Sequence, residues 1–298
     1  MKNFIALLAY LSISFANFYT ANASTDNAKE SKGVIQNISD KLLPSRGYTI
    51  KGKTKIDSAD ILSYIQNQKK SAKEVNIIQA FGTNYTGIDL NILYLNHISL
   101  RLQDFSRSDF EEANLGDLDL TSVKFTEANL TNCDLSSAIL NNTDFRKANL
   151  KGADLTMASL INADLREANL TGANLLGANL SGANLSGAIM VSANLRAVTG
   201  LQANFSGAQL PAAVFVSSNL FKANFHASNL SDADFLRASV VDADFSDAKI
   251  KGTIFKRADI RGANFDNTEI TRAYFKRAKI NNDDNLNNKK ILNEMVNR

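Results

Sequence analysis

An apolar residue recurs at every fifth position of this chain from Leu90 to Ile280 without a frame shift. Of these 39 frame positions, 38 carry Leu, Phe, Ile, Val or Met, and Gly200 is the exception. The residue two places before each frame position is Ala in 25 of the 39 cases. A period of five matches neither the 3.6-residue turn of an α-helix nor the alternation of a plain strand. Each five-residue unit must therefore combine a short extended piece with a bend.

Each unit has two inward positions, one small and one large. Between them the chain repeatedly places Asn or Asp, as at Asn174 and Asp234, whose side chain can bond to nearby backbone and hold the bend. Gly recurs two places after the frame position, as at Gly177, where a positive φ costs least. The pattern predicts a filled interior surrounded by short turns.

Phenylalanine indicates how many units form one coil. From Phe205 onward it occupies every second frame position. If one coil contains four units, or 20 residues, the rings form two stacks on opposite sides of the interior. One stack contains Phe205, Phe225, Phe245 and Phe265, and the other contains Phe215, Phe235, Phe255 and Phe275. A three-unit coil would scramble both stacks, whereas rings at a strand spacing of about 4.8 Å are favourable. The frame therefore predicts about ten coils in a rod about 48 Å long.

Residues 168–187 show the repeat in its most regular form, ANLTGANLLGANLSGANLSG. This A[DN]LxG motif in an unbroken frame resembles the pentapeptide-repeat family over residues 90–280. The resemblance implies an all-β fold, a right-handed quadrilateral (four-sided) β-helix solenoid. It implies no single function, because members include bacterial topoisomerase-protecting proteins that resemble DNA in shape and charge alongside many without an assigned role.

The first 23 residues differ from the rest of the chain. Lys2 precedes an uncharged apolar run from Phe4 to Phe18, and Ala21, Asn22 and Ala23 form an A-x-A cleavage pattern. The run is too short for a membrane span, which needs about 20 apolar residues. We therefore expect residues 1–23 to be a signal peptide, with no transmembrane segment after its cleavage, and the protein to be exported to the periplasm or secreted.

The remaining boundaries follow from the limits of the frame. Residues 24–87 are expected to be a linker and N-terminal cap, with a short helix over Asp57–Lys70 and a strand over Val75–Gly87. The solenoid is expected over residues 88–281 and a helical tail over residues 282–298. Because a β-helix has open strand edges at both ends, we interpret both flanks as small helical caps. A self-association helix is the alternative for the tail, whose apolar residues are Leu286, Ile291, Leu292, Met295 and Val296.

Motifs for catalysis are weak. GYTIKGKT, from Gly47 to Thr54, matches the G-x-x-x-x-G-K-[ST] phosphate loop, but it follows no buried strand and opens no helix. His97 and His226 lie far apart along the frame, and Cys133 falls in the inward set of small residues. A filled β-helix also has no interior pocket. We therefore expect no catalytic residue, no cofactor and no metal site, and a protein that is not an enzyme.

One side of the predicted rod is a candidate interaction face. Folding the frame by 20 residues gathers outward residues beside the Phe215 stack, namely Val214, Val216, Leu236, Arg237, Ile254, Lys256, Arg257, Tyr274, Lys276 and Arg277. The result is an apolar strip beside a basic ladder. Three interpretations remain open for it: a solvated face, a surface for a protein partner or self-association, and an anion site for polysaccharide, lipid headgroup or nucleic acid.

Taken together, these features predict an exported, non-enzymatic scaffold that binds a protein or a surface ligand. The alternatives are a binder of anionic polysaccharide or lipid headgroups and, from the family resemblance, a DNA-mimicking topoisomerase-interacting protein. The formal net charge of +3 opposes DNA mimicry, because a mimic of a duplex should be strongly acidic. The expected signal peptide also directs the protein away from the cytoplasm, so nucleic acid is not an expected partner.

Overall fold

The computed structural model describes residues 58–70, 88, 100–270, 272–281 and 291. Helix α3 spans Ser58–Lys70, one residue later than the expected start, and its residues Ile61, Leu62 and Ile65 are buried. Near the other end, Ile291 is helical and buried. The signal peptide, the linker, the phosphate-loop match, the Val75–Gly87 strand and the rest of the tail lie outside the described residues. The role of the flanks as caps stays a prediction.

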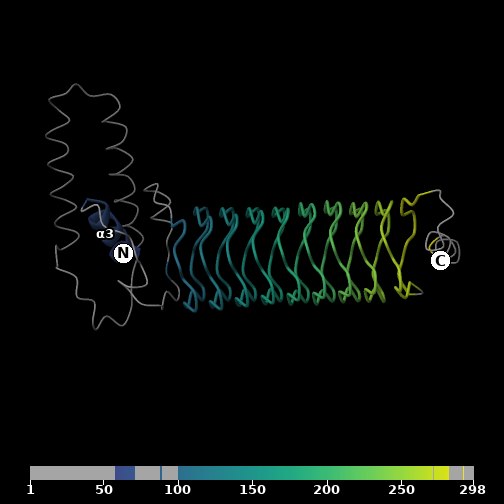
Figure 1. Ribbon diagram of the computed structural model, residues 1–298, viewed down its shortest axis with the longest axis horizontal. Helices are drawn as coiled ribbons and strands as arrows, with labels where there is room; N and C mark the ends of the chain where they lie inside the picture. The colour runs from purple at the N-terminus through teal and green to yellow at the C-terminus, as the bar shows by residue number, and fades with distance from the viewer. Residues whose placement is uncertain (1–57, 71–87, 89–99, 271, 282–290, 292–298) are drawn as a thin grey trace, which may run out of the picture. The chain divides into compact units, whose positions relative to one another are not determined.

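The five-residue frame forms a β-helix solenoid whose coils stack along one direction (Figure 1). Isolated parallel β-bridges join each bridge residue to the residue 20 positions later, from Asp104 with Lys124 to Asp259 with Lys279. The bridge residue is always the one before the frame position, and a turn of two residues follows each frame position. One coil therefore takes four units, as the spacing of the Phe residues predicts.

The hydrogen bonds of one unit explain why Asn and Asp recur. In the unit around Leu180, the N–H groups of Asn179, Leu180 and Gly182 donate to carbonyls of neighbouring coils at 2.6–2.9 Å. The Ala183 N–H closes the turn on the Leu180 carbonyl at 2.9 Å. The Ser181 N–H donates instead to Asn179 Oδ1 at 3.0 Å. All five backbone donors are thus satisfied, and the side chain before the frame position serves the one that has no backbone acceptor.

The second turn residue of each unit adopts a left-handed backbone conformation. Glycines in this position have φ between 66° and 75°, as expected, but 27 non-glycine residues take φ between 53° and 62° in the same place. A left-handed L-residue costs about 1–2 kcal/mol. Since the N–H of this residue donates to the next coil, as from Arg107 to the Thr126 carbonyl, coil stacking supports the strained conformation. Glycine is therefore favoured at the bend but not required.

The interior is filled by the two inward residues of every unit, and the described frame leucines and phenylalanines are fully or almost fully buried. Both predicted ring stacks are present, with Phe205 and Phe225 at 4.8 Å and Phe215 and Phe235 at 4.6 Å between nearly parallel rings. The two stacks also touch each other edge to face, as where Phe215 meets Phe225 at 5.7 Å and 88°. This second contact makes the C-terminal interior a continuous aromatic core.

Candidate binding surface

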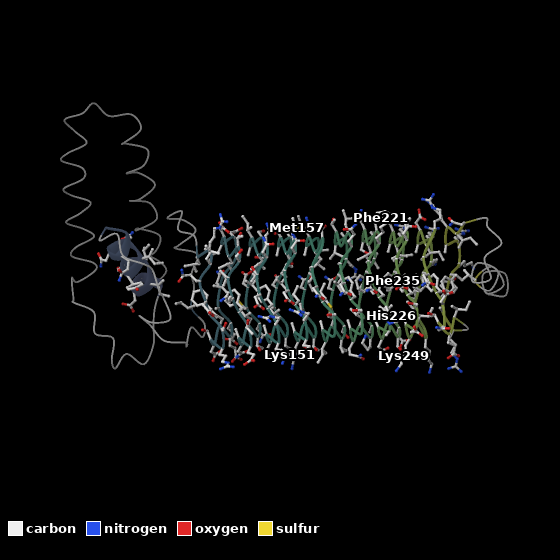
Figure 2. All side chains as sticks on the ribbon, in the orientation of Figure 1. Lys151, Met157, Phe221, His226, Phe235 and Lys249 are labelled. Atoms are coloured by element: carbon white, nitrogen blue, oxygen red, sulfur yellow. The ribbon has the colours of Figure 1, made fainter. Side chains whose placement is uncertain are left out.

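The outer surface is made by three residues of each unit, the one before the frame position and the two after it. These are half-buried or exposed in almost every unit, and the other two are buried. Figure 2 shows Met157 and Phe221 along one long edge of the solenoid and Lys151 and Lys249 along the opposite edge. The β-bridges place residues spaced by 20 on the same side.

The structure brings all ten predicted face residues onto one side, in four successive coils. The bridges join Val214 to Asp234, Asp234 to Ile254 and Ile254 to Tyr274. Backbone hydrogen bonds from Arg237 to the Lys256 carbonyl and from Arg257 to the Lys276 carbonyl keep the turn residues in register at 3.1 and 3.0 Å. We call this surface the candidate face. Its exposed members are Arg237, Arg257, Lys276 and Arg277, and its half-buried members are Val214, Val216, Leu236, Ile254, Lys256 and Tyr274.

Asp234 interrupts the apolar strip of the candidate face. It lies between Val214 and Ile254 in the bridge series, and its Oδ1 accepts the Leu236 N–H at 2.8 Å. The sequence pattern assigns Asp234 to the turn, which is correct, but it does not show that the same carboxylate stands between two apolar residues. Folding every outward position by 20 would have found it.

Three residues of the candidate face occupy places where the repeat prefers Asn or Asp. Val214, Ile254 and Tyr274 each precede a frame position and lack the carboxylate or amide oxygen with which Asp or Asn accepts the turn N–H. Fold stability therefore does not explain their presence on an outer surface. Local departures from a repeat's own rule are expected where a surface has a task.

Among the described residues, the basic residues of the candidate face have no ion-pair partner. Within the part of the chain that the structure describes, no carboxylate lies within 4.0 Å of the charged atoms of the five basic residues, which are Arg237, Lys256, Arg257, Lys276 and Arg277. Like charges about 5 Å apart in water repel by less than about 1 kcal/mol, so the ladder is stable without a ligand. The positive charge of the ladder is therefore available to an anionic ligand.

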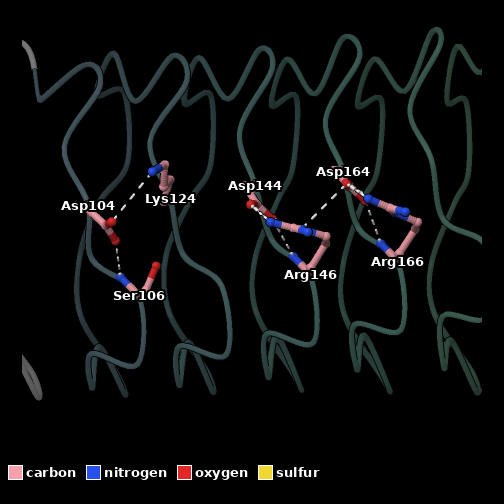
Figure 3. Close-up of polar contacts among 7 residues, drawn as sticks. All are labelled: Asp104, Ser106, Lys124, Asp144, Arg146, Asp164 and Arg166. Carbon is pink, nitrogen blue, oxygen red and sulfur yellow. Dashed lines mark hydrogen bonds and ion pairs between the residues drawn. The ribbon is translucent and has the colours of Figure 1, made fainter.

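On the opposite side of the solenoid, in earlier coils, charged residues pair with one another (Figure 3). Arg146 Nη2 donates to Asp144 Oδ2 at 2.6 Å, and Arg166 makes the same contact with Asp164. The hydrogen bond from Arg146 holds the pKa of Asp144 below its ordinary value, although partial burial acts in the opposite direction. We call this surface, with frame positions 105, 125, 145 and 165, the ion-paired side.

The ion-paired side carries a shallow pocket of about 300 Å³. Its lining residues are Thr126, Glu127, Arg146, Lys147, Arg166 and Glu167. Lys147 Nζ lies 3.8 Å from Glu167 Oε2, and Arg107 Nε donates to Glu127 Oε2 at 2.9 Å. Because its charges are largely neutralised by these local pairs, this pocket has less charge to offer a ligand than the candidate face.

The chemically reactive residues do not converge. Cys133 is buried, and this burial raises the pKa of its thiol far above the ordinary value, so a thiolate nucleophile is disfavoured. His226 Nδ1 lies 3.0 Å from Ser246 Oγ and 3.6 Å from Asp247 Oδ2 on the surface. His97 lies outside the described residues. Among those described, no group of three or more His, Cys, Asp or Glu residues could hold a metal ion.

The chain matches two family descriptions. The first, pentapeptide repeats, covers residues 104–142, 128–166 and 163–199, and the second, a pentapeptide repeat region, covers residues 201–265. No curated protein matches the chain. No helix within the described ranges is long and apolar enough to cross a membrane.

Several solved structures resemble the chain. HetL, a pentapeptide repeat protein involved in heterocyst differentiation regulation from the cyanobacterium Nostoc sp. strain PCC 7120, is 30% identical, with 72% of this chain and 92% of HetL covered and a TM-score of 0.31. AT2G44920, a pentapeptide repeat protein from the Arabidopsis thaliana thylakoid lumen, is 26% identical, with 44% and 66% covered and a TM-score of 0.25. Full-length QnrB1, a plasmid-mediated fluoroquinolone resistance protein, is 18% identical, with 59% and 97% covered and a TM-score of 0.29.

Proposed function

Because the chain belongs to the pentapeptide repeat family, we propose that it is a non-enzymatic scaffold, a right-handed four-sided β-helix whose candidate face binds another macromolecule. The filled interior supports this proposal. An enzyme needs a concave site with converging reactive groups, and the described solenoid has buried apolar residues where such a site would open. Regular outer sides present fixed rows of side chains at one strand spacing, which suits recognition of an extended partner.

One observation carries the proposal. Five basic residues without ion-pair partners among the described residues lie beside half-buried Val216, Leu236 and Tyr274, whereas charges on the opposite side, in earlier coils, are paired. Apolar surface contributes to affinity when a partner covers it. Unpaired charge orients the approaching partner and raises the rate of association. The candidate face therefore offers both contributions on one surface.

Export is part of the proposal. It is supported by the residue pattern of residues 1–23. Fractionation of cells that express the full chain, followed by N-terminal sequencing, tests it. We expect a mature N-terminus near Ser24 in the exported fraction. Cytoplasmic protein that retains Met1–Ala23 would contradict export.

The binding function is tested by crosslinking the full chain in its native envelope and identifying what is captured. The comparison protein carries Arg237→Ser, Arg257→Ser and Arg277→Ser together. Ser217 holds the same turn position one coil earlier with φ 58°, so the three substitutions should leave the melting temperature unchanged. We expect the unaltered chain to capture a partner and the triple variant to lose it. Equal capture by both proteins would mean that the candidate face is solvated surface.

An anionic polymer is a second candidate partner, favoured by the stacking of Arg237, Arg257 and Arg277 at one residue per coil. Binding through counterion release weakens steeply as salt rises. A polyuronate or anionic vesicle that the full chain binds at low salt and releases at moderate salt would support this ligand class. Retention that is independent of salt would exclude it in favour of a protein partner held by the apolar residues.

A further inference from the structure

The side that carries the candidate face continues through the whole described solenoid and reverses its charge. We call its outward residues in the nine units with frame positions 115 to 275 the long face. The first three units carry Asp117, Asp134 and Asp154 and no Lys or Arg. The last three carry the five basic residues of the candidate face and one carboxylate, Asp234. One side thus has an acidic end and a basic end.

The acidic end is as unpaired as the basic end. Within the described ranges, no Lys, Arg or His nitrogen lies within 4.0 Å of the carboxylates of Asp117, Asp134 or Asp154. One oxygen of Asp134 accepts the Ser136 N–H at 2.9 Å, and one of Asp154 accepts the Thr156 N–H at 2.9 Å, which leaves the second oxygen of each free of these bonds. Unpaired charge of both signs is therefore kept apart on this side.

The middle of the long face carries large apolar side chains beside Asn174, Asn194 and Arg196. Met157 is 64% exposed and Leu176 is 40% exposed, although both are large hydrophobic side chains. Half-buried Val214, Val216 and Leu236 follow on the C-terminal side of the middle. Arg196, in the central unit, is the one charged residue between Ala168 and Phe221. Large apolar side chains between opposite charges make a self-complementary arrangement.

An antiparallel copy of the same face fits this order. With a twofold axis at the central unit, around Leu195, the unit of Asp117 meets the unit of Arg277. The unit of Asp134 likewise meets the unit of Arg257. The unit of Asp154 and Met157 then meets the unit of Asp234, Leu236 and Arg237, where Asp154 and Asp234 form a like-charge contact. Leu176 meets Val216. Because the coil spacing is the same in both copies, these pairs stay in register along the whole interface.

We propose that the long face is a homodimer interface in which two copies of this chain lie antiparallel. The inference rests on the proposed binding function and names its partner as a second copy. Nine coils span about 43 Å, and a width of about 12 Å gives about 1,000 Å² buried in total, at the lower limit for a specific interface. The dimer is accordingly weak, concentration-dependent and weakened by salt.

A charge exchange tests the interface with the full chain in sedimentation velocity. The acidic variant carries Arg257→Asp and Arg277→Asp, and the basic variant carries Asp117→Arg and Asp134→Lys. Each new residue type already occupies the same unit position elsewhere, as Asp242, Arg237 and Lys124 show, so folding should be retained. Each variant alone should dimerise at least about tenfold more weakly than the unaltered chain. An equimolar mixture should restore a one-to-one heterodimer.

Two further variants sharpen the test. Lys147→Asp with Lys222→Asp matches the charge change of the acidic variant away from the long face and should dimerise like the unaltered chain. Arg196→Ser removes a like-charge contact at the twofold axis and should strengthen the dimer by up to about fivefold. A chain that stays monomeric at all concentrations, or variants that fail to recombine, would overturn the proposal.

The same acidic variant separates this inference from the proposed function. If it loses a heterologous partner in crosslinking while the unaltered chain is a monomer, the candidate face binds but the partner is not a second copy, and the dimer proposal falls. If the dimer forms as described and no other partner is captured, self-association is the binding event itself, and the dimer proposal stands.

Discussion

At the scale of single residues, the recurrence of Asn or Asp before the frame position has one cause: the N–H of the first turn residue has no backbone acceptor. In each regular unit the first turn residue depends on the side chain two places earlier, as Ser206 depends on Asn204 Oδ1 at 3.0 Å. Where Val214 or Ile254 stands in that place, the unit loses this bond and gains outward apolar area. Ile139 and Ile189 make the same exchange on other sides, and each is 42% exposed, so it is the combination of apolar and basic residues that distinguishes the candidate face.

The left-handed turn residue gives a stability prediction. Gly207 has φ +66°, and a Cβ added there would meet nothing within 4 Å. Gly207→Ala therefore introduces backbone strain without a clash, and we expect a loss of about 1 kcal/mol in the free energy of unfolding. Ala212→Gly, at φ 55°, is the matched control, and we expect it to be nearly neutral because strain relief offsets the greater freedom of the unfolded chain. Urea unfolding measures both, and an unchanged Gly207→Ala protein would contradict the strain.

At the scale of the coil, sequence alone predicts the elements that follow from spacing. The 20-residue coil and both Phe stacks are recoverable because every second frame position from Phe205 is Phe. The edge-to-face contacts between the stacks are not recoverable, because they depend on the distance across the interior. The ion pairs of Asp144 and Asp164 with arginines two residues later likewise depend on side-chain direction.

The aromatic core predicts how a coil fails. Phe245 is fully buried and lies 4.9 Å from Phe225 and 5.0 Å from Phe265. Phe245→Asp places an unpaired carboxylate inside one stack and against the edge of the other, so we expect a loss of at least about 4 kcal/mol and the unfolding of several coils. Phe245→Leu should cost only about 1–2 kcal/mol, since Leu185 fills the same side of the interior in an earlier coil. Circular dichroism during thermal unfolding distinguishes them, and similar melting of the two variants would show that residue 245 does not face the interior.

At the scale of the whole solenoid, charge is distributed along its length. Acidic and basic residues alternate and pair on the ion-paired side, as in the Asp144 to Arg166 series, whereas the long face separates them by several coils. Folding does not need this separation, because the same backbone ladder is formed in coils with and without charged outer residues. A surface used for binding explains it.

Site-specific photocrosslinking in cells tests that claim most directly. A photoreactive amino acid replaces Leu236 on the candidate face in one full-length protein, and in another it replaces Ser206, which is equally half-buried but lies on the side of the ion-paired residues. We expect a discrete adduct from position 236, to a second copy or another partner, and none from position 206. An adduct from position 206 alone, or from neither position, would contradict the assignment of the candidate face as the binding surface.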